Sequence, residues 1–178
     1  MLRACIAISP LEFEDVANIR DTTIPGPGGD LPVRIYTPSE GDNHPLIVWF
    51  HGGGWVIGDL DTEDVACRVI SNATDSVIVS IDYRLCPEVR FPEPVEDCYA
   101  GLLWAHANAS ELGADGSRIA VAGSSAGGAL SAATSLMARD RGGPYISHQV
   151  LFCPTLDNDF TSASYSRNAE GYGLTRDS

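Results

Sequence analysis

The sequence predicts one α/β domain, built on a mostly parallel β-sheet with helices on both of its faces. The 178 residues are enough for one domain with a sizeable buried core. Hydrophobic residues make up 44% of the chain and charged residues 20%, which is typical of a globular protein. Short apolar runs alternate with helical patterns along the chain, and this alternation is typical of right-handed βαβ crossovers.

The predicted strands are apolar runs bounded by turn-forming residues. Residues 46–50 read Leu-Ile-Val-Trp-Phe and lie between Pro45 and a run of glycines. Because apolar residues do not alternate with polar ones here, the run indicates a strand buried on both faces, as in a parallel sheet. We expect further strands of this kind at Val77–Ile81, Ile119–Ala122 and His148–Phe152. A tight Pro/Gly turn at residues 25–29 separates two extended runs, of which the second is Leu31–Thr37.

Helical patterns separate these strands. Thr62 is a candidate N-cap for the first helix. The apolar faces of the first two helices are expected to contain Val65, Val69 and Ala73, and Val95, Tyr99, Leu102 and Leu103, respectively. A third helix, rich in small residues, is expected from about Ala126 to Arg139, and the glycines at positions 142 and 143 end it.

Charge and cysteine content exclude several classes of function. Eleven Lys and Arg residues face twenty-four Asp and Glu residues, so the formal net charge of −13 argues against a nucleic-acid partner. No segment approaches the ~18–20 apolar residues of a membrane span. The first ten residues are too short, and too soon followed by acidic ones, for a secretory signal. The five cysteines are scattered without a C-x-x-C pair, which indicates neither a disulfide framework nor a metal site and favours a reducing, cytoplasmic compartment.

The strongest functional pattern is G-x-S-x-G at residues 123–127. An apolar strand precedes it and a helix of small residues follows, which is the context that a nucleophile elbow requires. The turn is tight, so side chains at Gly123 and Gly127 would collide with neighbouring backbone. The central residue, Ser125, would lie at a helix N-terminus, where unpaired N–H groups favour a developing negative charge. We therefore predict that Ser125 is a nucleophile.

A second glycine motif, His-Gly-Gly-Gly at residues 51–54, directly follows the predicted strand at 46–50. Acyl transfer places negative charge on the carbonyl oxygen of the substrate, and consecutive glycines let backbone N–H groups approach that oxygen closely. A loop of this type accompanies the nucleophile elbow in esterases and lipases. Both motifs end predicted buried strands, where the crevice of an open α/β sheet lies. The sequence therefore predicts an oxyanion hole beside the nucleophile.

Together these stretches resemble the hormone-sensitive-lipase-like family of α/β-hydrolases, which includes many microbial carboxylesterases. The resemblance also includes residues 82–88, residues 91–92 with Asp97, and residues 112–121, and it runs from about Thr23 to the last residue. It implies an α/β-hydrolase fold and hydrolysis of a small-molecule carboxylic ester through an acyl-enzyme. It implies neither a cofactor nor a metal.

The resemblance also implies residue roles. Ser125 corresponds to the nucleophile, and the oxyanion hole corresponds to the backbone N–H groups of Gly53, Gly54 and Ala126. His51 and Gly52 open the loop motif, and His51 orients that loop rather than serving as the general base.

Two further features of the resemblance concern the surroundings of the site. Asp82, Arg84 and Glu88 correspond to an ion-paired support of the crevice. The family usually has an aspartate before the nucleophile, whereas this chain has Ser124, so a charge beside the elbow is missing.

The acid and the histidine of the expected triad are predicted to be absent from the chain. In this fold the triad runs Ser, then Asp or Glu, then His. Only 53 positions follow Ser125 (178 − 125), and they offer His148 with Asp140 as the only acid between. We expect both at the ends of elements away from the site. The expected architecture is thus one partial domain over residues 1–178 that lacks the last strands and helices, with the start of a cap segment at about 160–178. A serine without its base is a weak nucleophile, so these residues alone are expected to have negligible activity.

The residues leave other functions open. An amidase or arylformamidase would use the same apparatus on a different substrate. A non-catalytic small-molecule receptor could keep the same fold and pocket without the histidine. The sequence sets neither the acyl-chain preference nor the oligomeric state.

Overall fold

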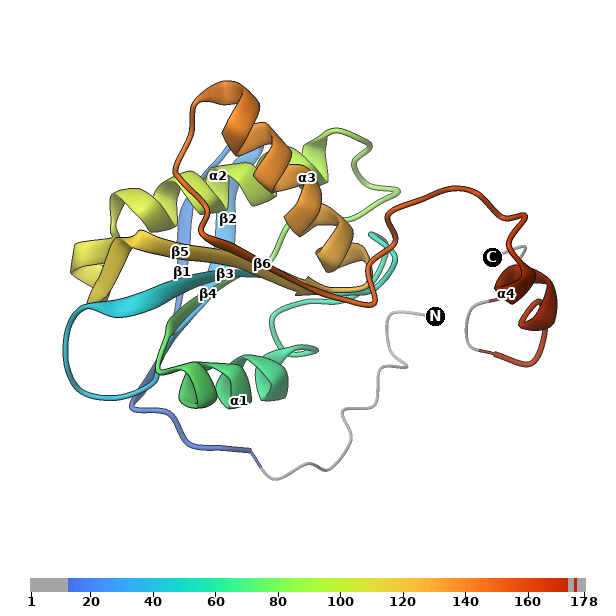
Figure 1. Cartoon of the computed structure of the whole chain (residues 1–178). Helices are drawn as coiled ribbons and strands as arrows, with labels where there is room; N and C mark the ends of the chain where they lie inside the picture. The colour runs from blue at the N-terminus through green and yellow to red at the C-terminus, as the bar shows by residue number, and fades with distance from the viewer. Residues whose placement is uncertain (1–12, 173–174, 176–178) are drawn as a thin grey trace.

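The structure, a computed structural model, describes residues 13–172 and residue 175, and its centre is a six-stranded sheet with strand order β1-β2-β4-β3-β5-β6 (Figure 1). The strands are β1 (Asn18–Gly26), β2 (Gly29–Thr37), β3 (His44–Phe50), β4 (Val77–Ile81), β5 (Ala114–Ser124) and β6 (His148–Phe152). The helices are α1 (Asp64–Thr74), α2 (Glu93–Ala107), the 3₁₀ helix η2 (Ala109–Leu112), α3 (Ala126–Arg141) and α4 (Ala163–Arg167).

The sheet is mixed. β3 pairs in parallel with both β4 and β5, and β5 pairs in parallel with β6. β1 and β2 form an antiparallel hairpin through the predicted Pro/Gly turn, and β2 continues antiparallel onto β4. The mostly parallel arrangement inferred from uninterrupted apolar runs is confirmed for the four strands from β3 to β6.

Helices cover both faces of the sheet, as predicted. α2 and α3 lie on one face and α1 lies on the other (Figure 1). β3 shows why its sequence does not alternate: Leu46, Val48 and Phe50 belong to the core cluster that includes residues of α2 and α3. Ile47 and Trp49 belong to the cluster that includes Cys67 of α1. Both sets are buried, so each face of β3 requires apolar side chains.

The prediction for α1 was wrong in its cap and in its face. Thr62 does not cap the helix, because its hydroxyl group donates a hydrogen bond to the Asp59 carbonyl oxygen (2.7 Å) and accepts one from the Asp59 N–H (3.1 Å). The N-cap position is Glu63. Val69 is 40% exposed, and the buried side of α1 instead contains Cys67 and Ser71.

Two other expectations need correction. On α2, Val95, Tyr99 and Leu102 are buried as expected, whereas Leu103 is exposed. β6 is not buried on both faces: its apolar residues Val150 and Phe152 are 43% and 46% exposed. β6 pairs with β5 along one edge, and no strand of the described residues pairs with its other edge.

After β6 the chain leaves the sheet and forms the short helix α4, which lies to one side of the layers (Figure 1). No residue of α4 is buried. Within the described part of the chain, no helix is both long and apolar enough to cross a bilayer. Cys67, Cys86, Cys98 and Cys153 are free thiols, and Cys5 lies outside the described residues.

Candidate functional site

Ser125 lies at the turn between β5 and α3, as the elbow pattern predicts. It is the N-cap residue of α3, and its backbone angles, φ 50° and ψ −114°, fall in a region that non-glycine residues rarely adopt. The Ser125 N–H donates to the Phe152 carbonyl oxygen at the end of β6 (2.8 Å), and the Ala129 N–H donates to the Ser125 carbonyl oxygen (3.1 Å). These two bonds attach Ser125 to the end of β6 and to the first turn of α3, and so hold its strained backbone in place.

Glycine at positions 123 and 127 lets the elbow pack against the end of β3. A methyl group at Gly127 would lie 1.9 Å from the carbonyl oxygen of Phe50 and 2.5 Å from that of His51. A methyl group at Gly123 would lie 2.5 Å from the same Phe50 oxygen. The two glycines therefore bring Ser125 next to the bend that begins at His51.

The glycine bend at residues 51–54 has the backbone conformation that glycine permits. Gly53 has a φ of 119° and Gly54 a φ of 60°. The Gly53 carbonyl oxygen accepts hydrogen bonds from the N–H groups of Val56 (3.1 Å) and Ile57 (3.0 Å), which close the bend into a turn. A methyl group at Gly53 would lie 2.0 Å from the Ile57 carbonyl oxygen, so no side chain fits there.

His51 is a buried support of this bend. Its ring stacks on Tyr83 at a centroid distance of 4.1 Å, and its backbone carbonyl oxygen accepts a hydrogen bond from the Tyr83 hydroxyl group (2.8 Å). Nδ1 lies 2.7 Å from the Gly52 carbonyl oxygen, and because that oxygen only accepts, Nδ1 carries the proton. Burial lowers the pKa of His51, although the bond to Gly52 opposes this shift. The ring is fully buried, and the lowered pKa favours its neutral form.

Glu63 joins the bend to the elbow, and the sequence reasoning missed it. Its Oε1 accepts a hydrogen bond from the Ser124 hydroxyl group (2.5 Å) and one from the Gly52 N–H (3.2 Å). The missing aspartate before Ser125 was a signal that some other residue could supply a carboxylate at this place. The pattern alone did not say which residue, because Glu63 is 61 positions from Ser124.

The four histidines of the chain all lie in the described region, and their positions do not suit a general base for Ser125. His51 is held as described above, His44 begins β3, and His106 lies in the last turn of α2. His148 pairs with Ala120, whereas Phe152 pairs with Ser124 beside the nucleophile. His148 is therefore four residues, or roughly 13 Å, from the elbow along β6.

The remaining candidate acid is also distant from Ser125. Asp140 lies near the end of α3, about four turns or roughly 20 Å from Ser125 along the helix. Its carboxylate pairs with Arg139 at the surface (2.7 Å).

Of the three residues expected in an ion-paired support, Arg84 forms its ion pair with Asp97, which the prediction did not include in that support. Arg84 forms two parallel bonds to Asp97 (2.7 and 2.8 Å), and the Asp97 side chain is 1% exposed. Asp82 instead faces His51, with 3.9 Å between its Oδ1 and the His51 Nε2. Burial, with Asp59 and Asp61 nearby, raises the pKa of Asp82 to about 6. Asp82, Arg84 and Glu88 all line a cleft of about 540 Å³.

An apolar cleft of about 480 Å³ begins at the glycine bend. Gly54 and Trp55 of the bend form one part of its wall, and Ala129, one turn after Ser125, forms another. The other lining residues are Val56, Cys86, Phe91, Pro94, Val95, Leu130 and Ala133. The side chains offer apolar surface and no charge. In the described part of the chain, no three His, Cys, Asp or Glu side chains are grouped to hold a metal ion.

Comparisons with known proteins agree with this fold. Residues 47–178 match the profile of a family described as alpha/beta hydrolase fold. Carboxylesterase NlhH from Mycobacterium tuberculosis is 44% identical over 171 residues, which make up 95% of this chain and 54% of NlhH. Carboxylic ester hydrolase LipN from the same organism is 48% identical over 162 residues, 88% of this chain and 43% of LipN.

A solved structure, the hyperthermophilic esterase from the archaeon Pyrobaculum calidifontis, superposes with a TM-score of 0.85 at 43% identity. The match covers 88% of this chain and 52% of that protein. This chain thus spans about half the length of the curated relatives it matches.

Proposed function

This chain belongs to the α/β-hydrolase family, and from that premise we propose that it carries the nucleophile and the oxyanion hole of a serine carboxylesterase. The observation that carries the proposal is the contact between the two glycine motifs. Gly123 and Gly127 fit against the carbonyl oxygens at the end of β3, and this places Ser125 beside the bend. The named activities of NlhH and LipN support ester hydrolysis as the reaction.

In the proposed reaction the Ser125 hydroxyl oxygen attacks the acyl carbon and loses its proton to a general base. The carbonyl oxygen becomes an oxyanion, which the N–H groups of Gly53, Gly54 and Ala126 bind. The C–O bond to the alcohol then breaks, and the alcohol leaves with a proton. Water hydrolyses the acyl-enzyme, which releases the carboxylic acid and restores Ser125.

We place the general base outside these 178 residues, in a longer protein. The support is the position of the four histidines, which are held in other contacts or lie far along their elements. The relatives named above are about twice as long as the matched segment.

The substrate that we propose is a neutral ester with an apolar group. The apolar cleft of about 480 Å³ adjoins both Gly54 and the first turn of α3, so it can hold the acyl or the alcohol part. The net charge of −13 disfavours anionic esters. The buried thiols Cys67 and Cys98 support a reducing compartment such as the cytoplasm.

Fluorophosphonate labelling and hydrolysis of p-nitrophenyl butyrate test this function in the protein at its natural length. Ser125→Ala should abolish labelling and lower turnover by about 10⁴- to 10⁶-fold, because the nucleophile is removed. Ser135→Ala is the matched control, since Ser135 lies on the same helix and its hydroxyl group donates to the Ser131 carbonyl oxygen (2.8 Å). Wild-type labelling in Ser125→Ala would refute the assignment of the nucleophile.

The same assay on the 178-residue chain tests the location of the base. This chain alone should show no hydrolysis above the buffer rate. Turnover that disappears in Ser125→Ala would show that a base lies within these residues.

A further inference from the structure

We propose that Glu63 is a positioning residue that ties the glycine bend to the nucleophile elbow and so sets the geometry of the oxyanion hole. This inference rests on the proposed function, because it assigns Glu63 a task in the same site. The comparisons and the sequence patterns give Glu63 no role.

The first argument is that two donors converge on one oxygen atom. Glu63 Oε1 accepts the Ser124 hydroxyl group at 2.5 Å and the Gly52 N–H at 3.2 Å. The shorter distance is typical of a hydroxyl group that donates to a carboxylate. Ser124 precedes the nucleophile and Gly52 precedes the two proposed oxyanion donors of the bend. The Glu63 side chain therefore binds the residue next to the nucleophile and the residue next to the proposed oxyanion donors of the bend.

The second argument is that the bend and the elbow approach each other closely at the Glu63 carboxylate. A methyl group at Gly52 would lie 2.7 Å from the Ser124 Oγ and 3.5 Å from the Glu63 Oε1. The space between the two loops holds the Glu63 carboxylate and nothing larger than a hydrogen atom at Gly52. The glycine bend, the nucleophile elbow and the Glu63 side chain are therefore closely packed at this contact.

The third argument concerns which N–H groups remain for the substrate. The Gly52 N–H donates to Glu63, so it is not among the N–H groups proposed to bind the oxyanion. The N–H groups of Gly53 and Gly54 follow it in the bend, and their direction depends on how the Gly52 peptide is held. Loss of the carboxylate would free that peptide and leave the half-buried Ser124 hydroxyl group without its acceptor.

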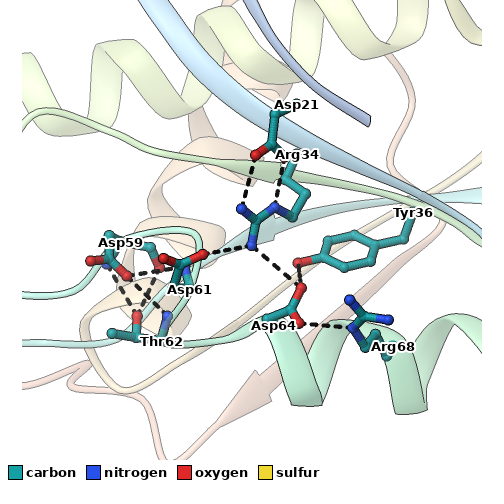
Figure 2. A network of polar contacts seen from close by, with 8 residues as sticks. All are labelled: Asp21, Arg34, Tyr36, Asp59, Asp61, Thr62, Asp64 and Arg68. Atoms are coloured by element: carbon teal, nitrogen blue, oxygen red, sulfur yellow. Dashed lines mark hydrogen bonds and ion pairs between the residues drawn. The ribbon is translucent and has the colours of Figure 1, made fainter. Parts of the chain in front are cut away.

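The fourth argument is that the backbone on both sides of Glu63 is anchored by the polar network in Figure 2. On one side, Asp61 accepts a hydrogen bond from Arg34 Nη1 (2.8 Å). On the other side, the buried Asp64 accepts bonds from the Tyr36 hydroxyl group (2.8 Å) and from Arg68 Nε (2.8 Å). The side chain of Glu63 makes no capping bond to α1 and is free to extend toward the elbow.

A double substitution separates positioning from a merely structural role. In Glu63→Ala the tie is lost, and we expect kcat to fall about 10- to 100-fold with KM within about 2-fold, because misplaced donors act on the transition state. Ser124→Asp in the otherwise unchanged protein should also be impaired, because it sets two carboxylates against each other. In the double variant Glu63→Ala/Ser124→Asp the new carboxylate can accept the Gly52 N–H, so kcat should return to within about 5-fold of the wild-type value.

The matched control is Glu111→Gln, which changes an exposed glutamate of η2. Its kcat should stay at the wild-type value. If Glu63→Ala does not fold, Glu63→Gln provides the test, since it keeps the shape and removes the charge, and its kcat should also fall. Wild-type kcat in the folded Glu63 variant, or a double variant as slow as Glu63→Ala, would overturn the proposal.

Amide hydrogen exchange at Gly52 gives a readout that does not depend on activity. We expect the exchange of the Gly52 amide to become at least about 10-fold faster in Glu63→Ala and to be slowed again in the double variant, because its acceptor is lost and then replaced. Unchanged exchange would refute the tie itself. If the wild-type protein shows no Ser125-dependent hydrolysis, the proposed function fails, and the exchange experiment still decides whether Glu63 holds the bend.

Discussion

At the scale of single residues, the site depends on groups that occupy costly conformations or environments. Ser125 has a positive φ of 50°, a conformation whose cost is of order 1–3 kcal/mol and which its bonds to β6 and α3 maintain. The G-x-S-x-G spacing could predict Ser125, because a tight turn requires glycine at fixed positions. It could not identify Glu63, because that contact depends on how two distant loops meet.

Asp82 is a second such residue, because its carboxyl group is largely buried. Its effect on the stability of the fold depends on pH. Burial raises the pKa of Asp82 from 3.8 to about 6. The folded protein binds the proton of Asp82 more tightly than the unfolded chain does. Protonated Asp82 therefore contributes to the free energy of unfolding below about pH 4, and this contribution is lost as the pH rises through about 6.

Asp82→Asn should therefore raise the free energy of unfolding at pH 7.5 by about 1–2 kcal/mol, and the gain should vanish at pH 4. The figure is below the ~3 kcal/mol of a two-unit shift because the side chain is 32% exposed. Urea unfolding at the two pH values measures the difference. Asp115→Asn is the control, because bonds to Ser117 and Arg118 lower the pKa of Asp115 to about 2. This substitution should lower, not raise, the free energy of unfolding at pH 7.5. An equal effect of Asp82→Asn at both pH values would contradict the explanation.

At the scale of elements, the strands were more predictable than the helix α1. β4 and β6 have the bounds that the apolar runs indicated, since these runs are bounded by residues that end strands. α1 differs because its buried side is determined by polar contacts rather than by apolar spacing. Asp64, at its first position, is buried against Tyr36 and Arg34 of β2 and pairs with Arg68 one turn later (Figure 2).

Arg34→Met tests this attachment of α1 to the sheet. Arg34 contacts Asp21, Asp61 and Asp64, and both its own side chain (15% exposed) and that of Asp64 (10% exposed) are largely withdrawn from water. Removal of the guanidinium group leaves three carboxylates close together without it, so we expect a loss of about 2–4 kcal/mol in the free energy of unfolding.

Arg139→Met is the control for this prediction. Arg139 also forms an ion pair, but it and Asp140 are 68% and 61% exposed, so its loss should leave the free energy of unfolding nearly unchanged. Urea unfolding at pH 7 measures both variants. Equal losses would show that the network around Arg34 contributes no more than a surface pair.

At the scale of the whole molecule, the sheet has one edge whose apolar surface is open to solvent. β6 exposes Val150 and Phe152, and within the described residues its outer edge pairs with no strand. Such an edge can pair with another chain. The predicted lack of the last strands already implied an uncovered sheet edge with exposed apolar surface, and the structure identifies β6 as that edge.

The 178-residue chain should therefore self-associate at micromolar concentration, and Val150→Lys should shift it toward the monomer by placing a charge on the edge. Sedimentation velocity measures the distribution of species. Val69→Lys is the control, since Val69 is similarly exposed, at 40%, but lies on α1 and not on a strand edge. A monomeric wild-type chain, or an equal effect of the control, would show that this edge is not the site of association.

The sequence by itself determined the strand and helix alternation, the nucleophile elbow and the glycine bend, and with them the α/β-hydrolase family. These features depend on local rules, because a tight turn or a doubly buried strand restricts which residues can stand at each position. Only the tertiary structure decided that Asp97 is the partner of Arg84, that Glu63 contacts Ser124, and that β6 is the strand at the exposed edge. Each of these depends on which distant segments come within a few ångströms, and residue spacing along the chain does not specify that.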